Sequence, residues 1–74
     1  MSLLDRITIE PGKLGGKPCI RGIRIRVTDV LELLAQGVTP QEVIEQYPYL
    51  ELEDVYASIE YASKQLELAY RKTS

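Results

Sequence analysis

The chain has 74 residues, of which 45% are hydrophobic and 27% are charged, and its formal net charge is −2. This length predicts a single domain, residues 1–74, whose one small core supplies roughly 3–5 kcal/mol of stability, so a partner or an oligomer would add to it. No segment approaches the roughly 20 apolar residues of a membrane-spanning helix, and the N-terminus lacks the basic and apolar regions of a signal peptide. We therefore expect a globular cytoplasmic protein with no membrane association.

Cysteine and histidine content excludes most metal and redox sites. The chain contains one cysteine, Cys19, and no histidine, so neither an intramolecular disulfide nor a Cys/His metal cluster can form. We expect Cys19 to be a buried structural thiol, because cysteine is among the residue types most often buried. No nucleophile stands beside a base, so the sequence predicts no enzyme activity, no catalytic residues and no cofactor.

Charge is divided unevenly along the chain. Residues 1–27 contain six basic and two acidic residues, whereas residues 28–74 contain three basic and nine acidic residues. A basic segment on an acidic body can bind nucleic acid, or it can pair with acidic residues of the same chain or of a neighbouring subunit. The candidates for DNA contacts are Lys13, Lys17, Arg21, Arg24 and Arg26. The alternative is that these cations form a solvated face that protects a strand edge, and both interpretations remain open.

The basic segment carries the alternation of polar and apolar side chains that is typical of short strands. It occurs in residues 6–10 and again in residues 23–27. Between them lies a short apolar piece, residues 18–20, followed by Arg21 and Gly22. Gly22 can adopt the positive φ of a tight turn, so we expect a small β-hairpin here.

The clearest helix signals surround a turn in the middle of the chain. Thr39 can cap a helix, Pro40 suits its first position, and Glu42 can reach back to the Thr39 amide. These residues predict a helix over 40–46. Gly37 follows an apolar run and favours the left-handed conformation that ends many helices, so another helix ends just before it.

Two further helices are expected on either side. The first is predicted over residues 29–36, with Thr28 as its cap. The third is predicted over residues 53–70, because Pro48 ends the second helix and apolar residues then recur every three or four positions. This helix is longer than its neighbours can cover. Its last turns are therefore expected to pack on the hairpin or on another chain, which makes Leu66, Leu68 and Tyr70 candidates for a partner interface and predicts a homodimer.

Three motifs of this sequence resemble a known bacterial family. The runs GGKPCIRGIRIRV, LELLAQGVTPQEVIEQYP and LEDVYASIEYA fall within residues 5–63 and closely resemble the family catalogued as domain of unknown function 433. The resemblance implies a mainly α fold, in which a three-helix, homeodomain-like helix-turn-helix core follows a short N-terminal β-hairpin. It also implies an antitoxin of VapB type, paired with a toxin of PIN-like nuclease fold. Ile23, Arg26 and Glu51 depart from the family's usual threonine, proline and threonine or serine.

Acidic residues at the start of the third helix argue against its use as a DNA-recognition helix. Glu51, Glu53 and Asp54 lie where such a helix contacts bases and phosphates, and they would repel the phosphates. If operator DNA is a partner, the basic hairpin is the better surface. The two functional hypotheses are an antitoxin-like regulator that binds a PIN-like toxin and DNA, and a structural or protein-interaction module without DNA binding.

Overall fold

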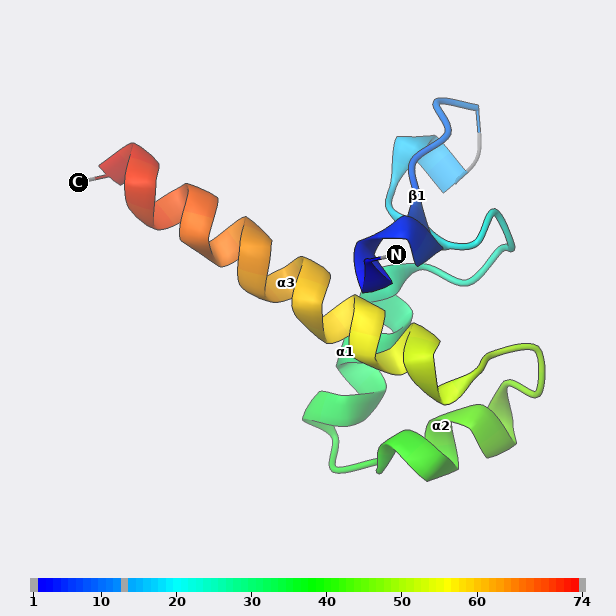
Figure 1. Ribbon diagram of the computed structural model, residues 1–74. Coiled ribbons are helices and arrows are strands. Elements are labelled where there is room, and N and C mark those ends of the chain that lie inside the picture. Colours follow the sequence, from blue (N-terminus) through cyan, green and yellow to red (C-terminus); the bar gives the residue numbers. More distant parts are fainter. Residues whose placement is uncertain (1, 13, 74) are drawn as a thin grey trace.

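The computed structural model describes residues 2–12 and 14–73, with side chains as far as Tyr70 (Figure 1). Three α-helices follow a two-stranded antiparallel sheet, which confirms the predicted fold class. In chain order the elements are the 3₁₀ helix η1 (Leu3–Arg6), β1 (Ile7–Thr8), the 3₁₀ helix η2 (Leu14–Gly16), β2 (Cys19–Ile20), α1 (Val27–Ala35), α2 (Pro40–Gln46) and α3 (Leu52–Thr73).

The sheet is shorter than the sequence predicts and pairs different segments. β1 runs antiparallel to β2, with Ile7 opposite Ile20 and Thr8 opposite Cys19. The strand predicted over 6–10 is therefore two residues long. Its start is displaced by η1, because Ser2 Oγ accepts a hydrogen bond from the Leu4 amide and begins a helical turn.

The hairpin turn forms where it was predicted, at Arg21 and Gly22. Both residues have positive φ, 45° and 74°, and the Ile23 amide donates to the Ile20 carbonyl over 2.8 Å. These features match a type I′ turn. The prediction of a second hairpin strand over 23–27 is wrong. This segment forms one isolated bridge, between Cys19 and Arg26, and α1 begins at the next residue.

α1 starts two residues earlier than predicted and ends at Ala35, one residue before the predicted end. Its cap is Arg26 rather than Thr28, because the carboxylate of Asp29 accepts the Arg26 amide at 2.9 Å as well as its guanidinium. The helix ends before Gly37, which has a φ of 93°. This left-handed glycine confirms the predicted boundary.

α2 has the predicted bounds because its capping signals are local. Thr39 Oγ1 accepts from the Glu42 amide at 3.2 Å, and Glu42 Oε1 accepts from the Thr39 amide at 3.0 Å. The same hydrogen bonds lower the pKa of Glu42 below its ordinary value. Pro40 occupies the first helical turn, where no amide donor is needed.

A small core fills the space between the sheet, α1, α2 and the first turns of α3. Its buried members are Ile20, Val27, Val30, Val43, Leu50 and Val55. Each such side chain contributes roughly 1.5–3 kcal/mol when it is fully removed from water. Cys19 is also buried and free, as predicted, and its Sγ donates to the carbonyl of Lys17.

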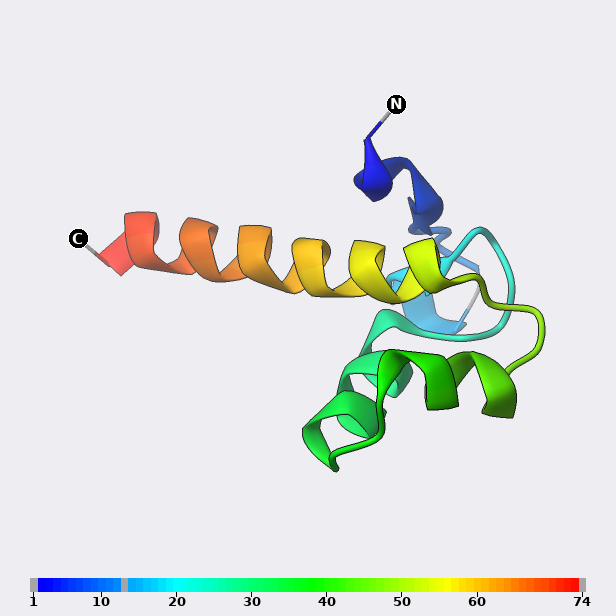
Figure 2. The same ribbon diagram turned by 60° about the horizontal axis from the view of Figure 1, so that its bottom comes forward.

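α3 extends well beyond this core. With 22 residues it is about 33 Å long, whereas α1 and α2 have nine and seven residues. Both views show its C-terminal half projecting from the body (Figures 1 and 2). Leu66, Leu68 and Tyr70 are exposed, so they do not pack on the hairpin, because the hairpin lies against the other end of the helix.

Gly37 provides a test of this fold. We expect Gly37→Val to lower the free energy of unfolding by about 1 kcal/mol, because a β-branched residue resists a φ of 93° although the space around the position is open. The melting temperature would fall by about 4–8 °C in a domain of this size. Gly12→Val is the matched control, since Gly12 lies in open space without a positive φ. Equal melting temperatures for the two variants would contradict the assigned helix end.

Candidate functional site

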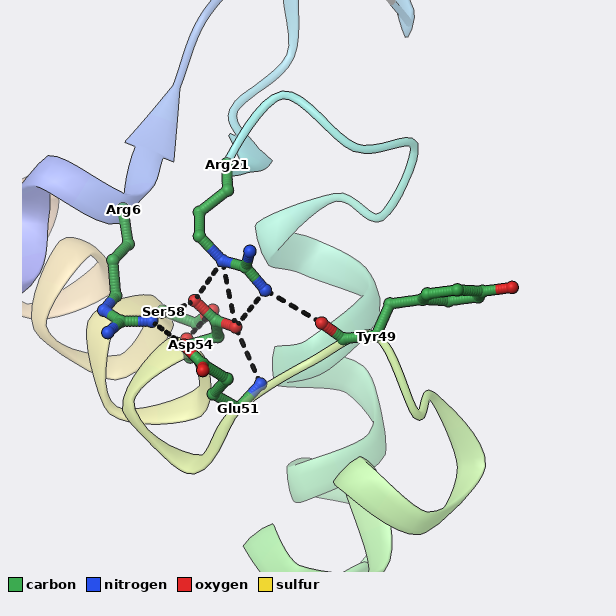
Figure 3. Close-up of polar contacts among 6 residues, drawn as sticks. All are labelled: Arg6, Arg21, Tyr49, Glu51, Asp54 and Ser58. Carbon is green, nitrogen blue, oxygen red and sulfur yellow. Dashed lines mark hydrogen bonds and ion pairs between the residues drawn. The ribbon is translucent and has the colours of Figure 1, made fainter.

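Two polar side chains in the described part of the chain are fully buried, those of Asp54 and Ser58, and Asp54 lies at the start of α3 (Figure 3). Asp54 is 0% exposed and accepts hydrogen bonds from three segments. Arg21 donates through Nε at 3.1 Å and Nη2 at 2.9 Å, and Arg6 donates through Nη1 at 3.0 Å. The Glu51 amide donates at 2.8 Å. We call these residues the Asp54 network.

The network joins four parts of the chain. Arg6 also pairs with the Glu51 carboxylate at 2.7 Å, and Arg21 Nη2 donates to the Tyr49 carbonyl at 2.8 Å. The Ser58 hydroxyl, one turn further along α3, donates to the Asp54 carbonyl. The N-terminal turn, the hairpin turn and the loop before α3 are therefore all held to the start of that helix.

The hydrogen bonds of the network favour the ionised forms of Asp54, Arg6 and Arg21. Burial acts to raise the pKa of Asp54, but the hydrogen bonds from Arg21, the Glu51 amide and Arg6 outweigh it, and the pKa lies below its ordinary value. Hydrogen bonds to Glu51 and then Asp54 raise the pKa of Arg6, and the hydrogen bond to Asp54 raises that of Arg21. The carboxylate is thus committed to structural ion pairs.

The structure separates the five predicted DNA-contact residues. Arg21 is bound to Asp54, and the guanidinium of Arg26 pairs with Asp29 at 2.9 Å. Lys17 and Arg24 are exposed. Lys13 lies outside the described residues. Two of the arginines assigned to DNA from the sequence therefore hold the fold together, and one of them, Arg21, does so while its side chain stays partly exposed.

An open apolar groove lies between the hairpin loop and the loop that follows α2. It is lined by Ile23, Arg24, Ile25, Tyr47 and Tyr49. Tyr49 is 79% exposed, and its backbone is held by the hydrogen bond from Arg21. Tyrosine and arginine beside aliphatic side chains form the composition that dominates binding energy at protein interfaces. Sequence reasoning missed this groove, although the closely spaced tyrosines Tyr47 and Tyr49 on either side of Pro48 were a signal for it.

The predicted partner-interface residues do not share one surface. Leu66 and Tyr70 are four residues apart and lie on the same side of α3. Leu68 is two residues from each, about 200° around the helix, and faces the opposite way.

Within residues 2–12 and 14–70, whose side chains are described, no three His, Cys, Asp or Glu side chains gather as a metal site. No helix among the described residues is long and apolar enough to span a membrane.

Comparisons with known proteins identify a family without an assigned activity. A family model described as "Protein of unknown function (DUF433)" matches residues 7–62. The uncharacterized protein y4eO of Sinorhizobium fredii is 36% identical over 56 residues, which are 76% of this chain and 25% of that protein. The crystal structure of a DUF433 member protein from Anabaena variabilis is 34% identical, with a TM-score of 0.78, and the match covers 90% of this chain and 66% of that one. The chain thus spans a quarter of the curated relative.

The Asp54 network predicts a large effect of one substitution. Asp54→Ala should cost about 1.5–3 kcal/mol, because it removes the charge-assisted hydrogen bonds from Arg6 and Arg21, whose side chains keep some access to solvent. This is a large share of the stability of so small a domain, so the circular dichroism melt should shift far downward. Glu53→Gln, at the exposed neighbouring position, should change stability by less than about 0.5 kcal/mol. Equal melts for both variants would refute a stabilising role for the network.

The same network predicts loss of stability in acid. A carboxylate whose pKa is depressed on folding contributes fully above its unfolded pKa of about 3.9, and this contribution is lost as pH falls through the folded value. The pKa of Asp29 is also lowered, chiefly by its hydrogen bond with the Arg26 guanidinium, so protonation of Asp29 in acid removes stability as well. Urea unfolding midpoints should therefore fall steeply below about pH 4. Asp54→Asn should have a lower midpoint at neutral pH and a flatter fall, whereas parallel pH curves would contradict the prediction.

Proposed function

This chain belongs to the family described as "Protein of unknown function (DUF433)", and we propose that it is a non-enzymatic, antitoxin-like module that regulates a protein partner by binding it. The supporting observation is the apolar groove, whose lining combines Tyr47 and Tyr49 with Arg24. The family resemblance suggests a toxin of PIN-like nuclease fold as the partner.

The groove is suited to a preformed contact with a protein. Arg21 donates a hydrogen bond to the Tyr49 carbonyl, so this loop loses little backbone conformational freedom when a partner covers it. Ile23 and Ile25 add apolar side chains to the lining, and Arg24 adds an exposed cation. This chemistry fits a partner that presents an apolar side chain next to a carboxylate.

The start of α3 is poorly suited to reading DNA. In a helix-turn-helix protein the first turns of the recognition helix enter the major groove. Here those turns carry Glu51, Glu53 and Asp54, and Arg6 and Arg21 lie against them within the same chain. In this proposal the helix-turn-helix core serves as a scaffold for protein binding.

Operator DNA is the second candidate partner, supported by exposed Lys17 and Arg24 beside the hairpin. Both side chains are free to contact phosphates because neither is needed for the Asp54 network. Such a surface would position the domain on the DNA backbone rather than read its sequence.

The partner proposal is tested by co-expression with the products of the neighbouring genes, among which a small nuclease-like protein is expected, followed by pull-down and titration calorimetry. Tyr49→Ala and Arg24→Glu should each weaken binding by about tenfold or more, since tyrosine and arginine dominate such interfaces. Glu53→Gln is the control and should bind as the wild type does. If the two groove variants bind with unchanged affinity, the groove is not the partner site.

The DNA proposal is tested by gel-shift titration on the upstream DNA of the gene over a range of salt. Replacing Lys17 and Arg24 together by alanine should reduce the slope of log affinity against log salt by about 1.8, at about 0.9 for each phosphate contact on duplex DNA. Arg26→Ala is the control, because Arg26 is paired with Asp29. Absence of wild-type binding at low salt, with and without the partner, would end this part of the proposal.

A further inference from the structure

The apolar groove has two walls that come from distant parts of the chain. Residues 23–25, after the hairpin turn, form the hairpin wall, and Tyr47 and Tyr49, after α2, form the tyrosine wall. In the described part of the chain, one hydrogen bond joins the segment 21–25 to the tyrosine wall, and Arg21 donates it. Arg21 itself is not among the residues that line the groove. It therefore links the two walls without offering a contact to a molecule between them.

The hairpin wall is fixed through the backbone of Arg21. The Arg21 amide donates to the Arg6 carbonyl at 2.7 Å, which holds the turn to the N-terminal segment. The Ile23 amide donates to the Ile20 carbonyl at 2.8 Å, and the Ile20 amide donates to the Ile25 carbonyl at 2.9 Å. The turn and the hairpin wall are thus held to β2 as one unit.

The tyrosine wall is held by the side chain of the same arginine. The Leu50 amide donates to the Tyr47 carbonyl at 2.9 Å, which closes a tight turn but does not place that turn against the hairpin. Placement comes from Arg21 Nη2, which donates to the Tyr49 carbonyl at 2.8 Å. Figure 3 shows this carbonyl facing the guanidinium while the Tyr49 ring points away from Asp54. The ring is therefore available to the groove that it lines.

Asp54 fixes the direction in which Arg21 presents this donor. Nε and Nη2 bind the carboxylate at 3.1 and 2.9 Å, so two hydrogen bonds set the plane of the guanidinium. Nη2 carries two hydrogens, which serve the carboxylate and the Tyr49 carbonyl. The Glu51 amide, two residues after Tyr49, donates to the same carboxylate at 2.8 Å. The loop that carries the tyrosine wall is thus bound to the Asp54 network at two points.

From these contacts we propose that Arg21 is the positioning residue of the groove, and that the reach of its side chain sets the spacing of the two walls. This role rests on the proposed function, since the spacing affects binding only where a partner enters the groove. Without the link, the tyrosine wall is free to move, and a partner has to order it on binding. Arg21 thus controls affinity for a partner that it does not touch.

Arg21→Asn separates this role from the stability of the turn. Asparagine followed by Gly22 is a favoured pair for a type I′ turn, so the hairpin is retained. The asparagine side chain is too short to reach the tyrosine wall. Arg6→Gln is the matched control, because it also takes a guanidinium from Asp54 but leaves the link in place. Arg21→Lys is a second variant that keeps a cation for Asp54 and lacks the planar pair of donors.

Nitrogen-15 relaxation of the full chain reads the order of the tyrosine wall without any partner. At a temperature where circular dichroism shows every chain folded, we expect a Tyr49 amide order parameter of about 0.85 in the wild type and in Arg6→Gln. In Arg21→Asn it should fall toward about 0.6, with a smaller fall in Arg21→Lys. A Tyr49 amide that stays ordered in Arg21→Asn, or loses the same order in Arg6→Gln, would overturn the proposal.

Affinity for the partner is the second readout, measured with the protein that the wild-type chain captures in the pull-down. Arg21→Asn should bind about tenfold more weakly, because the partner must order the loop, whereas Arg6→Gln should bind within about twofold of the wild type. Full affinity of Arg21→Asn for a partner that Tyr49→Ala loses would also overturn the proposal. If the wild-type chain captures no partner, the proposed function fails, and the relaxation data alone decide whether Arg21 positions the groove.

Discussion

The burial of the Asp54 carboxylate is the constraint on which this structure depends. An ionised group without solvent is tolerated when opposite charges and donors surround it, and here these come from residues 33 and 48 positions away in the chain. Arg6 and Arg21 belong to the basic segment, whereas Asp54 belongs to the acidic helical segment. Part of the charge asymmetry in the sequence is thus neutralised within the molecule, where the opposite charges stabilise the fold.

Local signals account for what could be predicted from the sequence. The bounds of α2 and the end of α1 depend on Gly37, Thr39 and Glu42, which act on neighbouring backbone groups, and these were predicted correctly to within one residue. The start of α1 was wrong because Asp29 binds its own preceding residue, Arg26. Asp54 could not be placed in advance, because burial of an acid at a helix start depends on partners brought together by the tertiary fold.

For the candidate surfaces, too, the residue spacing predicts which side chains share a face, whereas the tertiary structure decides which of them are covered. A period of three to four residues identifies the apolar side of α3, but the period alone does not say whether the core or another chain covers it. The short lengths of α1 and α2 decide this for Leu66 and Tyr70, which remain outside. The basic residues likewise form one group in the sequence and separate in the structure, where Arg21 and Arg26 bind carboxylates and Arg24 faces solvent.

The conformation of Arg21 restricts what can replace it. Its φ of 45° is one that a side-chain-bearing residue adopts at a cost on the order of 1 kcal/mol, and glycine would remove that cost. Glycine, however, would leave Asp54 with one arginine and the Tyr49 carbonyl without its donor. Lysine would restore a charge but not a planar group that reaches both acceptors. Position 21 is therefore occupied by a residue that is unfavourable for its turn and hard to exchange, so the hairpin turn and the start of α3 must change together in any sequence that keeps this fold.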